Sequence, residues 1–280
     1  MLVLVAVALF ACMDSAGKYL VTKFNVPFVA AVRYAINLLL LTALMAPRHG
    51  EALWATRRTG LVFVRGLSLA VATFFAGLAL QRMPVGETVA ILYLQGFGVM
   101  IAAGYFLKER IAVFGWIAAA IGFAGVLLIA RPGGALDPIG VFFALICAAV
   151  SVIYILLSRL LAPTESTMAM LFHVAIWGSV FYGLMLPFSW RGHTYEPIDL
   201  VLLAFMGVAS LAGHFLFTSA YRFAPASMLA PFNYFHIAFA VLLGWLIYAH
   251  VPDGLAFTGM AMIALSGAAV ALHTHLTKGI

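Results

Sequence analysis

Long apolar runs, separated by short polar segments, fill almost the whole chain. A helix that crosses a bilayer needs about 20 consecutive apolar residues, so 280 residues leave room for about ten such helices. The pattern therefore predicts an all-α, polytopic membrane protein. The expected spans cover residues 2–21, 28–46, 60–80, 85–106, 112–130, 139–160, 167–186, 198–221, 227–249 and 255–272.

The order of polar and breaking residues recurs in the second half of the chain. Pro84 recurs as Pro225 and Tyr93 as Tyr234, at the same interval along the sequence. Self-similarity at a fixed interval is typical of a duplicated structural unit. We therefore expect two five-helix repeats, over residues 1–131 and 138–275.

Five crossings are an odd number, so the second repeat should cross the membrane in the opposite direction. Inverted repeats are an architecture of many secondary transporters, whose substrate sites lie near the midplane between the two copies. We expect such a central cavity here. The short links at 81–84 and 222–225 predict tight helical hairpins. Pro84 and Pro225 would begin helices that rock, which makes them candidate hinges.

The amino-acid composition also indicates a membrane protein. Apolar residues make up 65% of the chain and charged residues 9%, against about half and about a quarter in soluble proteins. The net charge of +6 reflects basic loop residues beside anionic lipid, and no nucleic-acid partner is predicted. Cys12 and Cys147 lie in apolar runs, where a cysteine acts as a small hydrophobic residue, so free thiols are expected.

Loop charges predict the orientation of the chain. Nine Lys and Arg residues fall on the side of the two termini and six on the opposite side. Basic loops favour the cytoplasmic side, so both termini are expected in the cytoplasm and the protein in the inner membrane. The apolar run at 2–21 has no basic segment before it, which favours a first span over a signal peptide.

Charged residues inside the spans are candidates for function because burying a charge in lipid is costly. Asp14 and Lys18 are four residues apart and share one helix face, where they could form a structural ion pair. Asp14 could instead be a proton-coupling carboxylate. Glu87 lies in the first turn after Pro84, where an acid complements the helix N-terminus. Arg33 is expected to extend toward the outer surface of the membrane that the protein spans.

The main candidate substrate site is a polar and aromatic cluster near the middle of two spans. Its members are Tyr93, Gln95, Asn233, Tyr234 and His236. The repeat should place the two spans opposite each other, so their aromatic surface, donors and acceptors would make a small-molecule site. The alternative is that these groups only form hydrogen bonds between helices, at about 0.6–2 kcal/mol each.

Other polar residues could complete the wall of this site. We include His214 and Tyr154 as candidate substrate-binding residues, while packing explains His173, Trp177 and Asn37 equally well. The small residues of the expected spans 112–130 and 255–272 should serve close helix packing or dimerisation. The chain is thus expected as a monomer or homodimer, and neither a metal nor a cofactor is predicted.

The chain resembles the drug/metabolite transporter superfamily, EamA-type. The resemblance rests on the two five-span copies, Asp14-x-x-x-Lys18, Arg33-Tyr34 and the exit Lys108-Glu109-Arg110. Glu109 matches the Glu that closes the fourth span in that family, but the second copy departs from the pattern, because His250 stands where this Glu would recur. Within the family, the chain looks most like YddG-type exporters of aromatic amino acids. That resemblance implies a large, mostly hydrophobic central cavity lined by Tyr93, Gln95 and Tyr154.

The function expected from these observations is export of neutral amino acids, aromatic ones above all, across the inner membrane by alternating access. Protons are a candidate coupling ion. A carrier for a nucleoside, drug or sugar derivative is the alternative within the class. An intramembrane hydrolase is a third hypothesis, but Ser210 and His214 stand close together on one helix, which is not a nucleophile–base layout. We therefore do not expect an enzyme.

Overall fold

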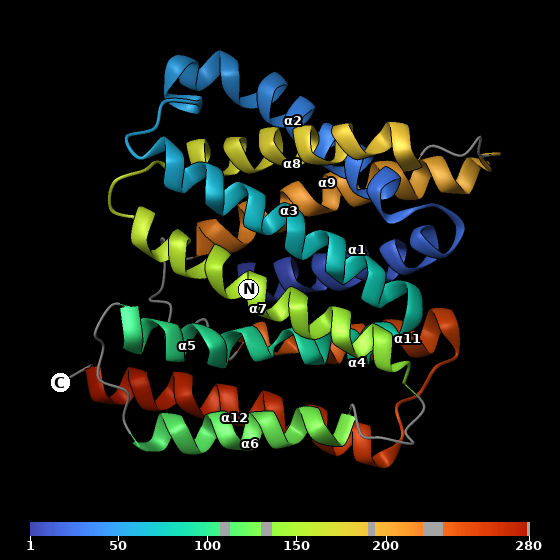
Figure 1. Ribbon diagram of the computed structural model, residues 1–280, viewed down its shortest axis with the longest axis vertical. Helices are drawn as coiled ribbons and strands as arrows, with labels where there is room; N and C mark the ends of the chain where they lie inside the picture. Colours follow the sequence, from blue (N-terminus) through green and yellow to red (C-terminus); the bar gives the residue numbers. More distant parts are fainter. Residues whose placement is uncertain (107–112, 130–135, 190–193, 221–231, 279–280) are drawn as a thin grey trace.

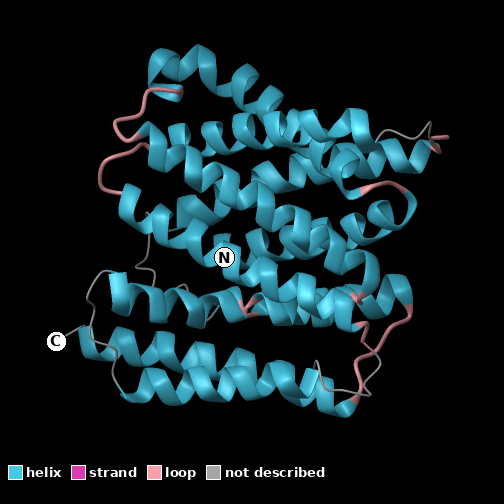
Figure 2. Ribbon diagram, in the orientation of Figure 1, coloured by secondary structure: helices cyan, strands magenta, loops and turns pink. Residues whose placement is uncertain are grey.

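α-Helices form almost all of the chain that the structure describes, and no strand occurs in that part. The computed structural model describes residues 1–106, 113–129, 136–189, 194–220 and 232–278 (Figure 1). The first half contains α1 (Leu2–Lys23), α2 (Val26–His49), the 3-10 helix η1 (Gly50–Leu53), α3 (Thr59–Arg82), α4 (Val85–Leu92), α5 (Leu94–Phe106) and α6 (Val113–Ile129). The second half contains α7 (Pro138–Leu161), α8 (Thr167–Ser189), α9 (Pro197–Ala220), α11 (Phe235–Tyr248) and α12 (Gly254–Lys278). The expected all-α class is thus confirmed for the described residues (Figure 2).

The helices lie side by side across the long axis of the molecule, as bundled membrane helices do (Figure 1). Seven helical segments are long and apolar enough to cross a bilayer, with α4 and α5 forming one of them. Shorter apolar helices are α6, α11 and the first part of α12. These findings support a multi-pass membrane protein, whereas the number of ten crossings stays a prediction.

Pro84 separates α3 from α4 in a tight hairpin. The Met83 amide still donates to the Ala79 carbonyl at 2.8 Å, and the backbone of Met83 and Pro84 is then extended. Proline has no N–H and suits the start of a helix, so α4 begins directly after it. The hairpin predicted at 81–84 is therefore present. The second predicted hairpin, at 222–225, lies outside the described residues together with Pro225.

Polar contacts at the helix ends show that α1 and α7 run in opposite directions. The Gln81 side-chain amide donates to the Val21 carbonyl at 2.7 Å, so α1 and α3 end at the same end of the bundle. Arg82 also pairs with Asp137 at 2.8 Å, directly before α7, and this hydrogen bond lowers the pKa of the Asp137 carboxyl. Because α7 begins where α1 ends, these equivalent first helices of the two halves are antiparallel.

The helix contacts between the two halves follow the pattern of a two-fold axis: each contact has an equivalent in which the corresponding helices of the two halves are interchanged. α1 packs against α9 as α3 packs against α7, and α2 packs against α9 as α3 packs against α8. The pairs α2–α8, α4–α11 and α6–α12 each join equivalent helices. The largest buried cluster unites side chains of α1, α3, α4, α9 and α11. The core of the molecule therefore lies between the halves and not inside either one.

Two glycines bring α6 and α12 into backbone contact along one edge of the bundle (Figure 1). A Cβ added at Gly125 would lie 2.6 Å from the Gly259 carbonyl oxygen. A Cβ added at Gly259 would meet the Gly125 carbonyl oxygen and would lie 2.9 Å from Ile129 Cγ1. This is the close packing through small residues that the sequence predicts for the two helices.

We expect Gly259→Ala to lower the midpoint of thermal unfolding in detergent. The added methyl would force backbone apart, and overpacking costs about 1–3 kcal/mol. Gly244→Ala is the matched control, because no atom lies within 4 Å of its new Cβ. Equal midpoints for the two variants would contradict the close α6–α12 contact.

Candidate functional site

A cavity of about 270 Å³ lies between helices of the two halves. Its wall comes from α1, α2, α3, α7, α8 and α9, with Leu92 of α4 and His236 of α11. Pockets for small molecules have volumes of about 300–1,000 Å³, so this cavity is close to the lower end. Most of the wall is apolar. The polar members include Asp14, Arg33, Asn37, Thr73, Ser151, Tyr154, Ser210, His214 and His236.

The Asp14 carboxylate and the His236 imidazole face each other at the cavity wall. The Asp14 Oδ2 atom of α1 lies 3.1 Å from the His236 Nε2 atom of α11. The two atoms are within ion-pair distance but are not aligned as a hydrogen bond. Both side chains are mostly buried. Asp14 is the only carboxylate among the described residues of the wall.

Lys18 is not the partner of Asp14, although the sequence places both on one helix face. Its ammonium group donates to the carbonyls of Leu80 and Met83, at 3.0 Å for Met83. The last carbonyls of a helix lack intrahelical donors, and a lysine can satisfy them. The expected Asp14–Lys18 pair is therefore replaced by two contacts, one at the end of α3 and one in the cavity.

His214 and Tyr154, both predicted as site residues, line the cavity. The His214 ring of α9 packs on Phe10 with centroids 5.0 Å apart. The Tyr154 hydroxyl of α7 accepts from Arg65 at 3.0 Å, and the same guanidinium lies 4.5 Å from the Tyr154 ring centroid. Arg65 is itself buried, and its two contacts fix the orientation of the Tyr154 side chain.

The remaining members of the predicted cluster lie beside the cavity and not in its wall. The Tyr93 hydroxyl donates to the Asn233 carbonyl at 2.6 Å, and the Tyr93 and Tyr234 rings are 5.2 Å apart. The Tyr234 hydroxyl lies against Gly267 of α12. Gln95 is half-buried near the start of α5. The structure thus divides the predicted cluster, and only His236 reaches the cavity.

The two tyrosines mark a break in each half of the molecule. Tyr93 separates α4 from α5, and Tyr234 directly precedes α11. Broken helices leave backbone groups without helical partners, and in a bilayer these need new ones. The Tyr93 hydroxyl supplies one of them to the Asn233 carbonyl. Discontinuous helices near the midplane are common beside the substrate sites of transporters.

Arg33 lines the cavity, whereas the sequence predicts that its side chain extends toward the membrane surface. Its guanidinium donates to Thr73 Oγ1 at 2.9 Å and lies 4.8 Å from the Tyr34 ring centroid. No carboxylate pairs with it in the described part of the chain. Asn37, four residues after Arg33, also lines the wall. This spacing is the feature of the sequence that could have predicted that both side chains face the cavity.

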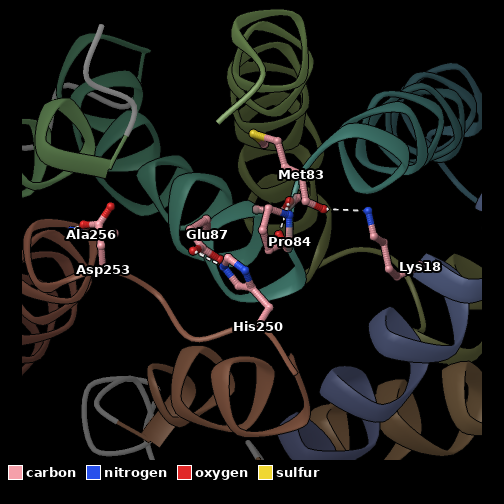
Figure 3. Close-up of polar contacts among 8 residues, drawn as sticks. Lys18, Met83, Pro84, Glu87, His250, Asp253 and Ala256 are labelled. Atoms are coloured by element: carbon pink, nitrogen blue, oxygen red, sulfur yellow. Dashed lines mark hydrogen bonds and ion pairs between the residues drawn. The ribbon is translucent and has the colours of Figure 1, made fainter. Parts of the chain in front are cut away.

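Polar contacts also tie the α3–α4 hairpin to its neighbours at what we call the hairpin end, defined by Lys18, Pro84 and His250 (Figure 3). Glu87 Oε1, in the first turn of α4, lies 2.7 Å from His250 Nε2, beyond the end of α11. The Glu87 side chain is 3% exposed. On the other side of Pro84, Lys18 binds the Met83 carbonyl. The hairpin is thus joined to both halves of the molecule.

The sequence profile of the EamA-like transporter family matches residues 1–131 and 138–272. The riboflavin transporter of Vibrio cholerae serotype O1 is 25% identical over 273 residues, 92% of this chain and 87% of that protein. The riboflavin transporter of Rhizobium johnstonii is 30% identical over 202 residues, 70% of this chain and 64% of that protein.

A second kind of relative is the S-adenosylmethionine uptake transporter of Rickettsia bellii, 24% identical over 251 residues, 89% of this chain and 85% of that protein. The structure superimposes on one solved crystal structure with a TM-score of 0.69. The superposition covers 97% of this chain and 96% of that one, at 18% sequence identity. At that identity the superposition shows the fold alone.

These comparisons confirm the family and leave the substrate open. The relatives are named as riboflavin or S-adenosylmethionine transporters, so the narrower resemblance to aromatic amino acid exporters is not supported. Both the family and these relatives are transporters, in keeping with the expectation that the chain is not an enzyme. The family profile covers almost the whole chain in two segments, and the chain therefore belongs to the EamA-like transporter family.

Proposed function

We propose that the protein carries a neutral, planar aromatic metabolite of the riboflavin kind through the central cavity by alternating access. The observation that carries this proposal is the charge pattern of the cavity wall. Arg33 has no acidic partner in the described part of the chain, whereas Asp14 already pairs with His236. Aromatic rings of Phe10, Tyr34 and Tyr154 complete the wall. Such a wall suits a flat ring that is rich in hydrogen-bond acceptors.

The same charges disfavour a cationic substrate such as S-adenosylmethionine. A free carboxylate would stabilise a sulfonium, and the only carboxylate in the described wall is Asp14, whose Oδ2 atom already lies 3.1 Å from His236 Nε2. A cation near Arg33 would also meet like charge, which is costly where the dielectric constant is low. Riboflavin is uncharged and offers ring carbonyl oxygens, which can accept from a guanidinium.

Neutral aromatic amino acids are the second candidate, and one feature of the cavity favours them. Arg33 could bind a carboxylate and Asp14 an ammonium group, so a zwitterion would find both partners. The ammonium group would have to displace His236 from Asp14. This competition makes amino acids the weaker of the two candidates. Export, the direction that the resemblance to amino acid exporters implies, is a part of that second candidate.

The membrane topology is also part of the proposal. The excess of Lys and Arg on the side of the termini supports an inner-membrane protein with both termini in the cytoplasm. In that orientation the hairpin end faces outward. Two inverted five-helix repeats, at 1–131 and 138–275, would open alternately around the cavity, with Pro84 and Pro225 as hinges. The protein would act as a monomer or homodimer.

Counterflow in proteoliposomes tests the proposed substrate. Vesicles are loaded with unlabelled riboflavin, and entry of labelled riboflavin is followed with phenylalanine or S-adenosylmethionine as competitor. We expect accumulation that riboflavin suppresses and that the other two leave unchanged. Accumulation in protein-free vesicles would show leakage. Entry of labelled phenylalanine, with no riboflavin entry in folded protein, would reject the flavin proposal in favour of amino acids.

A further inference from the structure

Two polar side chains of α2 face the cavity one helical turn apart. Arg33 and Asn37 both line its wall, and residues four apart share one face of a helix. Arg33 carries only donors, whereas an asparagine amide carries both donors and an acceptor. Each of the two side chains has hydrogen-bonding groups without a partner in the protein. α2 therefore brings one buried donor without an acceptor, Arg33 Nε, and one buried acceptor without a donor, Asn37 Oδ1, to the wall of the same cavity.

The guanidinium of Arg33 is held in a fixed place. It lies over the ring of Tyr34, which is 2% exposed and stacks on Tyr182 with centroids 5.6 Å apart. The Tyr182 hydroxyl in turn donates to the Ala70 carbonyl at 2.7 Å. Thr73 and, weakly, Met13 are the acceptors of Arg33 in the described chain, and its Nε has none. The donor set is thus preorganised.

The amide of Asn37 is held on one side only. Its Nδ2 donates to Ser210 Oγ of α9 at 3.2 Å, while its Oδ1 accepts from no donor. A buried acceptor without a donor costs roughly as much as a lost hydrogen bond. An incoming N–H group would remove that cost, so the position favours a ligand with a donor next to its acceptors.

We propose that Arg33 and Asn37 bind the imide edge of a pyrimidinedione ring, the edge at which riboflavin carries a carbonyl, an N–H and a second carbonyl. Arg33 donates to a ring carbonyl oxygen, and Asn37 Oδ1 accepts from the ring N–H. The inference rests on the proposed function and deepens it, because it names the part of the substrate that the protein distinguishes. A site that pairs with an N–H rejects an analogue that lacks it, since the acceptor then stays unpaired.

The test compares binding of riboflavin and of 3-methylriboflavin, whose ring N–H is replaced by N–CH₃, to the purified full chain in detergent. Quenching of flavin fluorescence gives the two dissociation constants. We expect the wild type to bind riboflavin roughly tenfold or more tightly than the methyl analogue. Asn37→Ala should reduce this ratio to about one, and Asn37→Asp, which keeps an acceptor, should restore part of it. Arg33→Gln should weaken binding of both flavins by roughly 10- to 100-fold.

Asn25→Ala, directly before α2, is the matched control, because its side chain donates to the Ser189 carbonyl at 2.7 Å and does not line the cavity. It should keep the wild-type ratio. If the wild type binds both flavins equally, the imide inference is wrong while riboflavin transport stands. If folded wild type binds neither flavin, both the inference and the proposed substrate are wrong. The comparison in the wild type decides even where a variant fails to fold.

Discussion

Asp14→Asn is expected to abolish accumulation of substrate driven by a pH gradient, while leaving exchange of substrate across the membrane in place. Asp14 is the only carboxylate in the described cavity wall, and it lies 3.1 Å from His236. Paired carboxylate and imidazole groups inside a membrane are typical of proton relays. Asparagine has nearly the same shape but cannot take up or release a proton, so coupling fails and the cavity remains.

The size of this effect follows from the gradient that is applied. One pH unit corresponds to about 1.4 kcal/mol per proton, and that energy is about tenfold in an equilibrium ratio. Wild-type proteoliposomes should therefore accumulate labelled riboflavin about tenfold for one pH unit and one coupled proton, and the variant should reach about equal concentrations. Gradients of both signs should be applied, since the sequence leaves symport and antiport open.

Asp137→Asn is the control for Asp14→Asn, because Asp137 also pairs with a basic side chain, Arg82 at 2.8 Å, but lies away from the cavity. It should accumulate substrate like the wild type. Counterflow without a gradient should remain within about twofold of the wild type in both variants. If Asp14→Asn still accumulates substrate in response to pH, Asp14 is not the coupling group, and the Asp14–His236 pair only stabilises the contact between α1 and α11.

The fold was the part of the molecule that the sequence predicted well, and the reason is physical. A bilayer leaves helices as the main way to satisfy backbone groups, so apolar runs identify helices directly. Pro84 lacks an N–H, and the tight hairpin at that residue follows from its chemistry. The single span expected at 85–106 is broken at Tyr93. No proline or glycine stands at Tyr93, so composition gave no sign of the break.

The site was harder to predict, because a helix that is apolar on all sides carries little information about its rotation. Tyr93 and Tyr234 recur at one interval, and this regularity drew attention to the helix breaks and not to the cavity wall. Arg33 was placed at the surface because arginine usually extends there. Only the packing of α2 against α8 and α9 shows that Arg33 and Asn37 face inward.

Joining α4 to α11 by a disulfide is expected to stop transport. A Cβ added at Gly86 would lie 3.5 Å from the Val241 Cβ, within the range of about 3.5–4.5 Å found in disulfides. Gly86→Cys with Val241→Cys should therefore cross-link on oxidation, in a background where the free thiols Cys12 and Cys147 are replaced. Gly86 directly precedes Glu87, whose contact with His250 holds the hairpin end.

The expected loss follows from alternating access. If the hairpin end opens during the cycle, α4 must move away from α11, and a covalent bond prevents this. Oxidised protein should lose counterflow in proportion to the fraction of chains that are cross-linked, because an S–S bond of about 2 Å holds the two helices together. A reducing agent should restore the rate.

A cross-link between α6 and α12 separates this effect from simple rigidification. The added Cβ of Gly125 lies 3.2 Å from the Met262 Cβ, slightly closer than the usual disulfide range, and we expect these closely packed helices to stay together during the cycle. Gly125→Cys with Met262→Cys should transport at the same rate oxidised and reduced, a comparison that cancels the crowding of the new Cβ against the Gly259 carbonyl oxygen. If the α4–α11 cross-link forms completely and counterflow continues at the wild-type rate, the hairpin end does not open between these helices. Movement would then have to occur at another contact that joins the two halves, such as that between α1 and α9 or between α3 and α7.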